Sequence, residues 1–450
     1  MIGLNKIGLN QVQLNRLRLN APFPAYGKMA GGGGSSDGFP QLPGDVTRWH
    51  FGGLTNEMMA AMDDPRIEDA DHKGRFLSFK NFAWKEGSGI SDIYPGALVF
   101  DGVDDYGVCE NFPILTKEKG YTVVVLRQWD QDFLNTTLTG GLLSTRNYST
   151  GEGVAFEKIE SSNKGYWNLG AGGIIDFAKS PFTWQTSKQY NNVGILKGDK
   201  NHGKPLCVGC GLSGGQQCGR FAIWELVFLD HDATEEELTK IKDYFVKTYP
   251  WLFPDQAWTV VGKTNEDEDR ATIANITGNG NDLVCLNLGF IEGSGYNEEG
   301  EYAGYLVTDG VDDKITSSTF EMGNDWTVIG DWELINTGKN DNAGIVKFDS
   351  IVIYNYNPIL INIKNGRNNL IPDQNTVNAI CSDGRIYSKD WKESIYNEET
   401  ESTSKNLLTI GYSGNSYTKI AFKNLAIYPT VLSKEDCIKA YNYLQTLKAK

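Results

Sequence analysis

Short apolar runs, each ended by a turn sequence, recur along most of this chain. They include residues 121–126, 141–143, 326–329 and 344–348. Apolar runs that stop at Gly, Asn or Asp predict β-strands joined by tight turns. Because no long helical pattern separates these runs, the sequence predicts antiparallel β-sandwich structure.

One such run occurs twice. Residues 97–106 read Ala-Leu-Val-Phe-Asp-Gly-Val-Asp-Asp-Tyr, and Asp-Gly-Val-Asp-Asp returns 208 residues later within 305–314. The Asp can bond its own backbone and Gly accepts positive φ, so the motif predicts strand, turn, strand. Three further pairs match in the same order: 53–57 with 262–266, 86–89 with 292–295, and 221–228 with 420–427. This spacing is too long for a solenoid and predicts two copies of one domain.

Each copy should end in a helix. Thr234 begins a capping box, and Leu238, Ile241 and Phe245 would share one helix face. Ser433 begins the counterpart 199 residues later. The predicted fold class is therefore all-β, with two tandem antiparallel jelly-roll sandwiches, each with a short C-terminal helix. The predicted domains are 44–254 and 255–450, which we expect to touch across a short boundary.

The N-terminal segment has another pattern. Leu-Asn recurs every five residues between positions 4 and 20, and residues 2–20 contain eight large apolar residues. Such a short segment cannot bury them by itself. It carries Lys6, Arg16 and Arg18 but no acid. Residues 1–30 are predicted to be a β-rich segment that either packs on the first domain or anchors the protein to an assembly. Residues 31–43 form a predicted Gly-rich tether.

Charge and cysteine content narrow the function classes. The formal net charge is −15, from 57 acidic and 42 basic residues. This balance argues against nucleic-acid binding, which needs clustered Lys and Arg. No apolar run has the length of a membrane helix, and no N-terminal run resembles a secretory signal. Seven scattered cysteines do not suggest a disulfide framework, so we expect folding in a reducing cytosol.

Two resemblances follow from these residues. The run at 98–106, the strand at 226–228 and the helix start at 234–238 resemble laminin-G/concanavalin-A-like jelly-roll modules, and 408–411 with 426–428 are similar in the second copy. That resemblance implies a sandwich fold that hosts lectins, adhesion modules and glycanases. The N-terminal repeat followed by a glycine tether resembles the starts of tailed-phage fibre proteins.

Catalytic residues are not predicted. Glycanases of the resembled fold carry Glu-x-Asp-x-x-Glu on one strand, because retaining hydrolysis needs two carboxylates about 5 Å apart. The chain has no such sequence. The acidic clusters 68–71 and 266–269 lack this spacing, and no Ser or Cys motif accompanies the four histidines. These histidines are His50, His72, His202 and His231.

Metal and ligand sites remain open from sequence. The resemblance implies a possible Ca²⁺ site, for which the Asp residues of both turns have the right chemistry, although we favour turn capping. These residues are Asp101, Asp104, Asp105, Asp309, Asp312 and Asp313. A zinc set of His202, Cys207, Cys210 and Cys218 is disfavoured, because Cys207 and Cys210 should point to opposite faces of a strand. We therefore expect no metal or cofactor. Trp129, Trp167, Trp184 and Trp391 could serve either core or glycan binding.

The function that these patterns favour is a non-enzymatic phage virion protein, a fibre or fibre-like decoration that adheres to host surface glycans. Its expected partners are a capsid or tail protein through residues 2–20, a glycan, and further copies of itself, possibly as a trimer. It would be made in the host cytoplasm and displayed outside the cell. The alternatives are a cellular carbohydrate-binding lectin or adhesion module, and an unusual glycanase.

Overall fold

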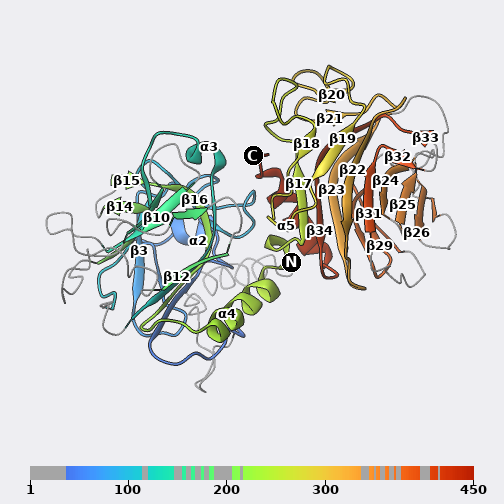
Figure 1. Ribbon diagram of the computed structural model, residues 1–450. Coiled ribbons are helices and arrows are strands. Elements are labelled where there is room, and N and C mark those ends of the chain that lie inside the picture. The colour runs from blue at the N-terminus through green and yellow to red at the C-terminus, as the bar shows by residue number, and fades with distance from the viewer. Residues whose placement is uncertain are drawn as a thin grey trace, which may run out of the picture.

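A computed structural model describes most of both halves of the chain (Figure 1). The described residues are 37–113, 120–145, 155–158, 164–167, 174–176, 182–186, 205–212, 216–335, 344–348, 351–354, 360–363, 369–370, 377–395, 406–413 and 416–449. The predicted N-terminal segment, 1–30, and residues 31–36 of the predicted tether lie outside them. Among the described helices, none has the length and apolar character needed to cross a membrane.

The first sandwich consists of two facing sheets. One has the order β12-β7-β16-β5-β4, with β1 also paired to β16. Its strands are β1 (Val46–His50), β4 (Gly89–Ile90), β5 (Leu98–Asp101), β7 (Thr122–Trp129), β12 (Phe182–Thr186) and β16 (Arg220–Leu229). The other has the order β11-β10-β9-β8-β13-β6-β3-β2, with the β14–β15 hairpin against β8. Its strands are β2 (Arg66–Glu68), β3 (Phe76–Lys80), β6 (Tyr106–Cys109), β8 (Gly140–Ser144), β9 (Ala155–Lys158), β10 (Lys164–Trp167), β11 (Ile174–Asp176), β13 (Leu206–Val208), β14 (Cys210–Leu212) and β15 (Gln216–Cys218).

The second sandwich repeats this plan. One sheet has the order β20-β21-β34-β23-β28-β29-β30, with β17 paired to β34. Its strands are β17 (Gln256–Thr259), β20 (Gly295–Tyr296), β21 (Leu306–Val307), β23 (Thr327–Leu334), β28 (Val377–Cys381), β29 (Arg385–Ser388), β30 (Glu393–Ile395) and β34 (Ile420–Tyr428). The facing sheet has the order β18-β19-β22-β31-β24-β25-β26-β27, and β32 pairs with β33. These strands are β18 (Thr272–Ile273), β19 (Leu283–Leu286), β22 (Lys314–Phe320), β24 (Gly344–Phe348), β25 (Ile351–Tyr354), β26 (Leu360–Ile363), β27 (Asn369–Leu370), β31 (Asn406–Ile410), β32 (Tyr412–Ser413) and β33 (Ser416–Tyr417).

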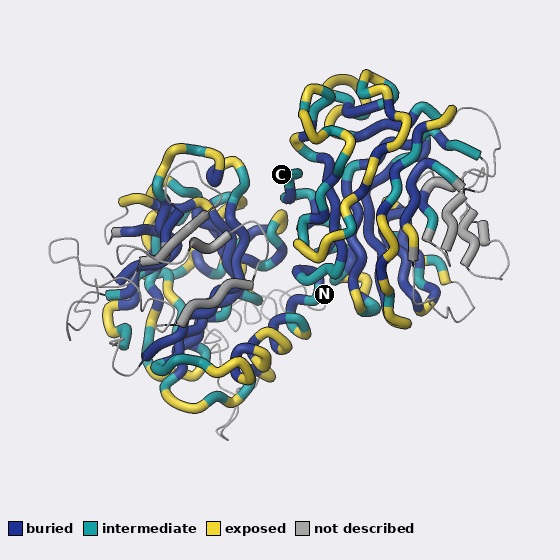
Figure 2. Tube along the Cα trace, in the orientation of Figure 1, coloured by how far each residue is buried: buried dark blue, intermediate teal, exposed yellow. Residues whose placement is uncertain are grey.

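Each sandwich encloses its own apolar core (Figure 2). Trp49, Phe100 and Trp129 are fully buried between the sheets of the first. Trp258 and Trp332 are fully buried in the second. Consecutive strands such as β5, β6 and β7 alternate between the facing sheets, as in a jelly roll. The predicted all-β class with two tandem antiparallel sandwiches is confirmed.

A shared irregularity supports the predicted duplication. In the first sandwich, β16 loses register with β7 at Trp224, between the paired residues Ile223 and Glu225. In the second, β34 loses register with β23 at Lys423, which is 199 residues later. A β-bulge adds one unpaired residue and re-aims the strand. The same bulge at the same place indicates two copies of one backbone design.

The two closing helices begin where the sequence predicted. α4 (Glu235–Thr248) has Thr234 as its N-cap, and the reciprocal capping box with Glu237 is complete. α5 (Lys434–Gln445) has Ser433 as its N-cap. The remaining helices of the described residues are short: α2 (Asn56–Ala60), α3 (Gln131–Leu134) and the 3-10 turn η2 (Pro250–Leu252).

A further apolar cluster joins the two sandwiches. It contains buried residues of α4 and α5 together with Trp224 of the first sandwich and Tyr428 of the second. The Tyr443 hydroxyl of α5 donates to Oε1 of Gln128 in β7 at 3.1 Å. The two halves therefore pack through helix α5, in agreement with the expected contact (Figure 1).

The end of the predicted tether belongs to the packed body. Phe39 is 7% exposed and lies in the cluster that joins the halves. Its ring meets that of Tyr244 edge-on, with centroids 5.1 Å apart. Residues 37–43 therefore do not behave as a flexible tether, and the packed chain begins before residue 44.

Candidate functional site

The Asp-Gly-Val-Asp-Asp turns are built by the same contacts in both sandwiches. Oδ1 of Asp101 accepts the backbone amides of Val103, at 2.7 Å, and Asp104, at 3.3 Å. Gly102 has a φ of 76°, which glycine adopts without strain. The corresponding residues are Asp309, Val311, Asp312 and Gly310. The first Asp of each motif is thus a turn cap.

The last Asp of each motif is buried and holds a second loop. Oδ2 of Asp105 accepts the amide of Asp101 at 3.0 Å, and Oδ1 accepts the Ser88 hydroxyl at 3.1 Å. Ser88 Oγ in turn accepts the amide of Ala83 at 2.8 Å. The equivalent set is Asp313, Asp309, Ser294 and Gly289. The repeated sequence segments 86–89 and 292–295 are therefore explained by the loop that this Asp fixes.

This loop carries the same uncommon backbone conformation in both copies. Trp84 has a φ of 50° and Phe290 a φ of 51°. Bulky residues rarely adopt positive φ, so neighbouring contacts must hold them there. Trp84 stacks on Phe82 with ring centroids 4.9 Å apart, and Phe290 stacks on Tyr296 at 6.2 Å. Aromatic packing thus supports both residues in this conformation.

Burial raises the pKa of the last Asp in each motif. Desolvation raises the pKa of Asp105 to about 6, although hydrogen bonds from Ser88 and Asp101 oppose the rise. Desolvation also raises the pKa of Asp313. In the second copy both hydrogen bonds go to Oδ2, and the buried Oδ1 of Asp313 has no hydrogen-bond partner among the described residues. The two copies thus have the same backbone arrangement, but the hydrogen bonds are distributed differently over the two carboxylate oxygens.

The aspartates of each motif are close enough to hold a cation. The carboxylate oxygens within each trio lie within 4.8 Å of one another. However, Asp101 and Asp105 already accept backbone amides, as expected for the turn-capping role. Ca²⁺ requires six or more oxygen ligands. A calcium ion would have to compete with these hydrogen bonds, and calcium binding stays a hypothesis.

The acidic clusters that were considered for catalysis support loops. Oδ1 of Asp69 accepts the amides of Lys73, at 3.1 Å, and Arg75, at 2.9 Å. Asp267 accepts the amide of Thr264 at 2.9 Å and its hydroxyl at 3.0 Å. These hydrogen bonds lower the pKa of Asp267. The carboxylates therefore act as loop caps.

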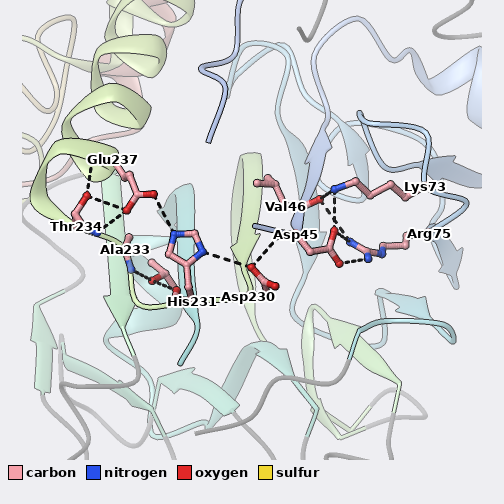
Figure 3. Close-up of polar contacts among 10 residues, drawn as sticks. Asp45, Val46, Lys73, Arg75, Asp230, His231, Ala233, Thr234 and Glu237 are labelled. Atoms are coloured by element: carbon pink, nitrogen blue, oxygen red, sulfur yellow. Dashed lines mark hydrogen bonds and ion pairs between the residues drawn. The ribbon is translucent and has the colours of Figure 1, made fainter. Parts of the chain in front are cut away.

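The described histidines contact carboxylates. His231 lies between Asp230, 3.4 Å from Nδ1, and Glu237, 3.1 Å from Nε2 (Figure 3). Asp230 also accepts the amide of Asp45 at 2.8 Å, so the contacts link the ends of β1 and β16 to the start of α4. His72 lies 3.1 Å from Glu68. His202 lies outside the described residues.

A buried polar network around Glu225 was not predicted. Glu225 Oε1 is 2.6 Å from His50 Nδ1 and accepts the Tyr249 hydroxyl at 2.9 Å, and Oε2 is 3.4 Å from Arg48. Arg48 is 1% exposed and also pairs with Asp37. One signal in the sequence could have revealed it: a Glu in the middle of the apolar run 221–229.

The Tyr249 hydroxyl of this network is shielded from solvent. Burial first, and then the nearby Glu225 carboxylate, raise the pKa of Tyr249 well above its usual value. Tyr249 is only 3% exposed, so its hydroxyl stays neutral. The network joins β1, β16 and α4. In the second copy, Ala257 and Asn424 occupy the positions of Arg48 and Glu225.

Three cysteines of the first sandwich lie together. Cys210 and Cys218 form a disulfide, a bond that the sequence did not predict. Cys207 lies in the same buried cluster, because Gly209, with a φ of 97°, turns the chain between β13 and β14. Cys207 and Cys210 therefore do not point to opposite faces, and that prediction was wrong. Two of the three cysteines considered for zinc are already joined to each other, which removes that hypothesis in this state.

The tryptophans considered for glycan binding divide into two groups. Trp129 is fully buried in the first core. Trp391 packs edge-on against Tyr441, with centroids 5.7 Å apart. The side chains of Trp167 and Trp184 lie outside the described residues. Trp129 is therefore a core residue, whereas Trp391 is partly buried and packs against the cluster that joins the halves.

Comparisons with known proteins give distant structural similarities alone. No family model and no curated protein matches the chain. The chain is similar to the receptor-binding domain of botulinum neurotoxin type G, with 12% identity, a TM-score of 0.28, and coverage of 42% of this chain and 50% of that one. It is also similar to the receptor-binding domain of botulinum neurotoxin D, with 11% identity and a TM-score of 0.29. That match covers 80% of this chain and 96% of the neurotoxin domain.

A sialidase is similar to the same extent. Trypanosoma rangeli sialidase is 9% identical, with a TM-score of 0.32 and coverage of 84% of this chain and 68% of the sialidase. The chain spans about half the length of the first two structures that it matches, at 50% and 52%. At these TM-scores no residue role or activity is transferred from any of them.

Proposed function

We propose that this chain is a non-enzymatic structural protein of a tailed-phage particle, a fibre or fibre-like decoration. Its N-terminal segment would attach it to a capsid or tail protein, and its two sandwiches would adhere to glycans on the host surface. It would be made in the host cytoplasm and act outside the cell. The proposal draws on the phage-fibre resemblance of the N-terminal sequence and on the duplicated sandwiches.

The N-terminal segment carries the proposal, because it has no counterpart in the second copy. The first strand of each sandwich, β1 or β17, pairs with the same long strand, β16 or β34. The second sandwich builds that sheet without any equivalent of residues 2–20. Burying each of the eight large apolar side chains in that segment would contribute about 1.5–3 kcal/mol. We expect residues 2–20 to gain this free energy by burying their apolar side chains against another chain, outside the repeated fold.

Strand pairing between chains is the expected form of attachment. An alternating segment can add a strand to a neighbouring sheet, where backbone hydrogen bonds supply affinity. Its basic residues would favour an acidic partner surface, whereas the whole chain has a net charge of −15. Several copies of this chain could associate through the segment, with a trimer as the state that the resemblance favours.

The polar groups of the sandwiches favour adhesion over catalysis. The carboxylates considered above are used in turns, caps and one ion-pair network. Two tandem sandwiches on each of several chains would also multiply weak glycan contacts, since linked sites raise avidity without new contacts. Adhesion of this kind needs no strong individual site.

Deletion of residues 1–30 tests the attachment. The truncated protein should keep both sandwiches folded by circular dichroism, yet be absent from purified particles. A full-length control in which Lys6, Arg16 and Arg18 are replaced by Gln separates charge from apolar burial and should retain at least partial incorporation. Normal incorporation of the truncated protein would refute the anchor. Binding without turnover on a bacterial glycan panel is the matching expectation for the sandwiches, and release of reducing ends would refute the non-enzymatic assignment.

A further inference from the structure

The two copies close the same surface hairpin by different chemistry. In the first sandwich, β14 pairs with β15, and Cys210 lies directly opposite Cys218. In the second, β32 pairs with β33, and Tyr412 lies directly opposite Tyr417. A disulfide joins the first pair, whereas the two tyrosine rings meet with centroids 4.8 Å apart.

Backbone contacts establish that these hairpins are equivalent. The amide of Gly219 donates to the carbonyl of Gly209 at 2.9 Å, and the amide of Thr418 donates to that of Gly411 at 2.9 Å. Gly209 and Gly411 both have positive φ, at 97° and 78°. With this register, Cys210 corresponds to Tyr412.

The first hairpin is tightly seated on its sandwich. A Cβ atom added to Gly141 of β8 would lie 2.0 Å from the amide nitrogen of Gly211, so the hairpin backbone approaches β8 as closely as glycine allows. Sγ of Cys210 is 3.4 Å from the carbonyl oxygen of Asp105. The hairpin therefore rests on both β8 and the Asp-Gly-Val-Asp-Asp turn.

The strands of this hairpin provide little other cross-strand support. β14 and β15 are three residues each and are paired at Cys210–Cys218 and Leu212–Gln216. Gln216 and Gln217 are exposed. Outside the hairpin, β15 pairs with β8 at one position, Cys218–Gly141. Cys210 and Cys218 are the pair in which both residues are buried. Their disulfide is therefore the main side-chain link between the two strands of the hairpin.

We propose that the β14–β15 hairpin is a redox-dependent element of the first sandwich, closed by the Cys210–Cys218 disulfide in oxidising surroundings and loosened when these cysteines are reduced. The β32–β33 hairpin, which the Tyr412–Tyr417 pair closes, does not respond to redox conditions. This inference goes beyond the proposed function and does not depend on it.

The chemistry requires an oxidant that the environment supplies. The thiols of Cys210 and Cys218 together give up two electrons and two protons, and a small disulfide such as oxidised glutathione takes them up to become two thiols. A disulfide of this kind persists in an oxidising compartment and is rare where glutathione is reduced. The state of the Cys210–Cys218 pair therefore depends on whether the surroundings of the first sandwich are oxidising or reducing.

The neighbouring Cys207 is not expected to scramble this bond. Cys207 is 1% exposed and lies in the same cluster. Burial raises the pKa of its thiol to about 12. Because the thiolate is the attacking species in disulfide exchange, a thiol with this pKa reacts slowly at neutral pH. The pairing of Cys210 with Cys218 should therefore be unique.

Thiol counting and amide hydrogen exchange on the full chain test the proposal. Protein equilibrated with oxidised glutathione, then denatured and alkylated, should show a single Cys210–Cys218 linkage by mass spectrometry, with Cys207 alkylated. Exchange of residues 210–218 should become at least about tenfold faster after reduction with a phosphine, because the closed loop loses its constraint. Exchange of residues 412–417 is the internal control and should not change.

Removal of the two thiols provides the variant. C210S/C218S should exchange quickly in both conditions, because serine cannot form the bond. If C210S/C218S does not fold, the comparison of oxidised with reduced wild type carries the test. Equal exchange in the oxidised and reduced wild type, or full alkylation of Cys210 and Cys218 after oxidation, would each overturn the proposal.

Discussion

Asp105 and Asp313 occupy the same position in the two copies and have the same structural role. Each carboxylate fixes the backbone of its own turn and the hydroxyl of a serine in the neighbouring loop. A buried acceptor with two donors is worth more than either hydrogen bond alone, because removing it leaves buried donors unsatisfied. The repeated motif is therefore explained at the level of single residues as a structural clamp.

Replacing Asp105 by Asn should alter the pH dependence of stability. The pKa of Asp105 is about 6 in the folded protein, above its ordinary value of 3.8. The folded protein thus binds this proton more tightly than the unfolded chain does. Protonation stabilises the fold at low pH, and that contribution is lost as the pH rises through the window from about 4 to about 6. Asp105→Asn should show a smaller loss of unfolding free energy across this window than the wild type.

Urea unfolding at several pH values measures the effect. Asp63→Asn is the control, because Asp63 is exposed and is not among the groups that shift the pKa of Asp105, so it should keep the wild-type slope. Identical slopes for the wild type and Asp105→Asn would show that the buried carboxylate does not hold a proton in this range.

At the scale of elements, helix α4 is attached to the first sandwich by charge as well as by apolar packing. The Tyr244 hydroxyl of α4 lies 3.3 Å from Glu225 in β16 and 3.2 Å from Arg48 in β1. In the second sandwich, Ala257 and Asn424 stand at the equivalent sites, and the Tyr441 side chain of α5 hydrogen-bonds Asp331 of β23 instead. The two helices are thus docked by different interactions on the same backbone.

Arg48→Ala should destabilise the first sandwich strongly. Removing one partner of a buried ion pair leaves an uncompensated charge and costs about 3–5 kcal/mol. The double variant Arg48→Ala/Glu225→Asn copies the residues of the second sandwich and should recover part of that loss. Urea unfolding compares the three proteins. An equal loss in the single and double variants would attribute the cost to lost packing of the arginine rather than to the charge left on Glu225.

Local patterns predicted the elements, whereas long-range partners escaped prediction. The run 121–126 lies in β7, and both closing helices begin at the predicted caps, because alternation and capping depend on neighbouring residues. Arg48 and Glu225 are 177 positions apart, and no local pattern reveals such a pair. The Cys210–Cys218 disulfide was missed because the positive φ of Gly209 bends an apparent strand, which alternation cannot show.

The two sandwiches are packed against each other and share a third apolar core, so the molecule is not a pair of independent domains. One core lies inside each sandwich, and the third contains α4, α5 and the outer faces of one sheet from each half. Trp224 and Tyr443 meet across this third core with ring centroids 6.3 Å apart. Separating the halves would expose this apolar surface to water, so their stabilities should be coupled.

Trp49→Ala distinguishes coupled from independent halves. Trp49 is fully buried in the inner core of the first sandwich, and its truncation should cost about 3–5 kcal/mol. If the halves unfold together, hydrogen exchange by global unfolding in β23 of the second sandwich should accelerate as much as exchange in β7 of the first. Val103→Ala, at a residue that is 72% exposed, is the control and should change neither. Acceleration confined to β7, or two separate calorimetric transitions, would show that the third core does not couple the halves.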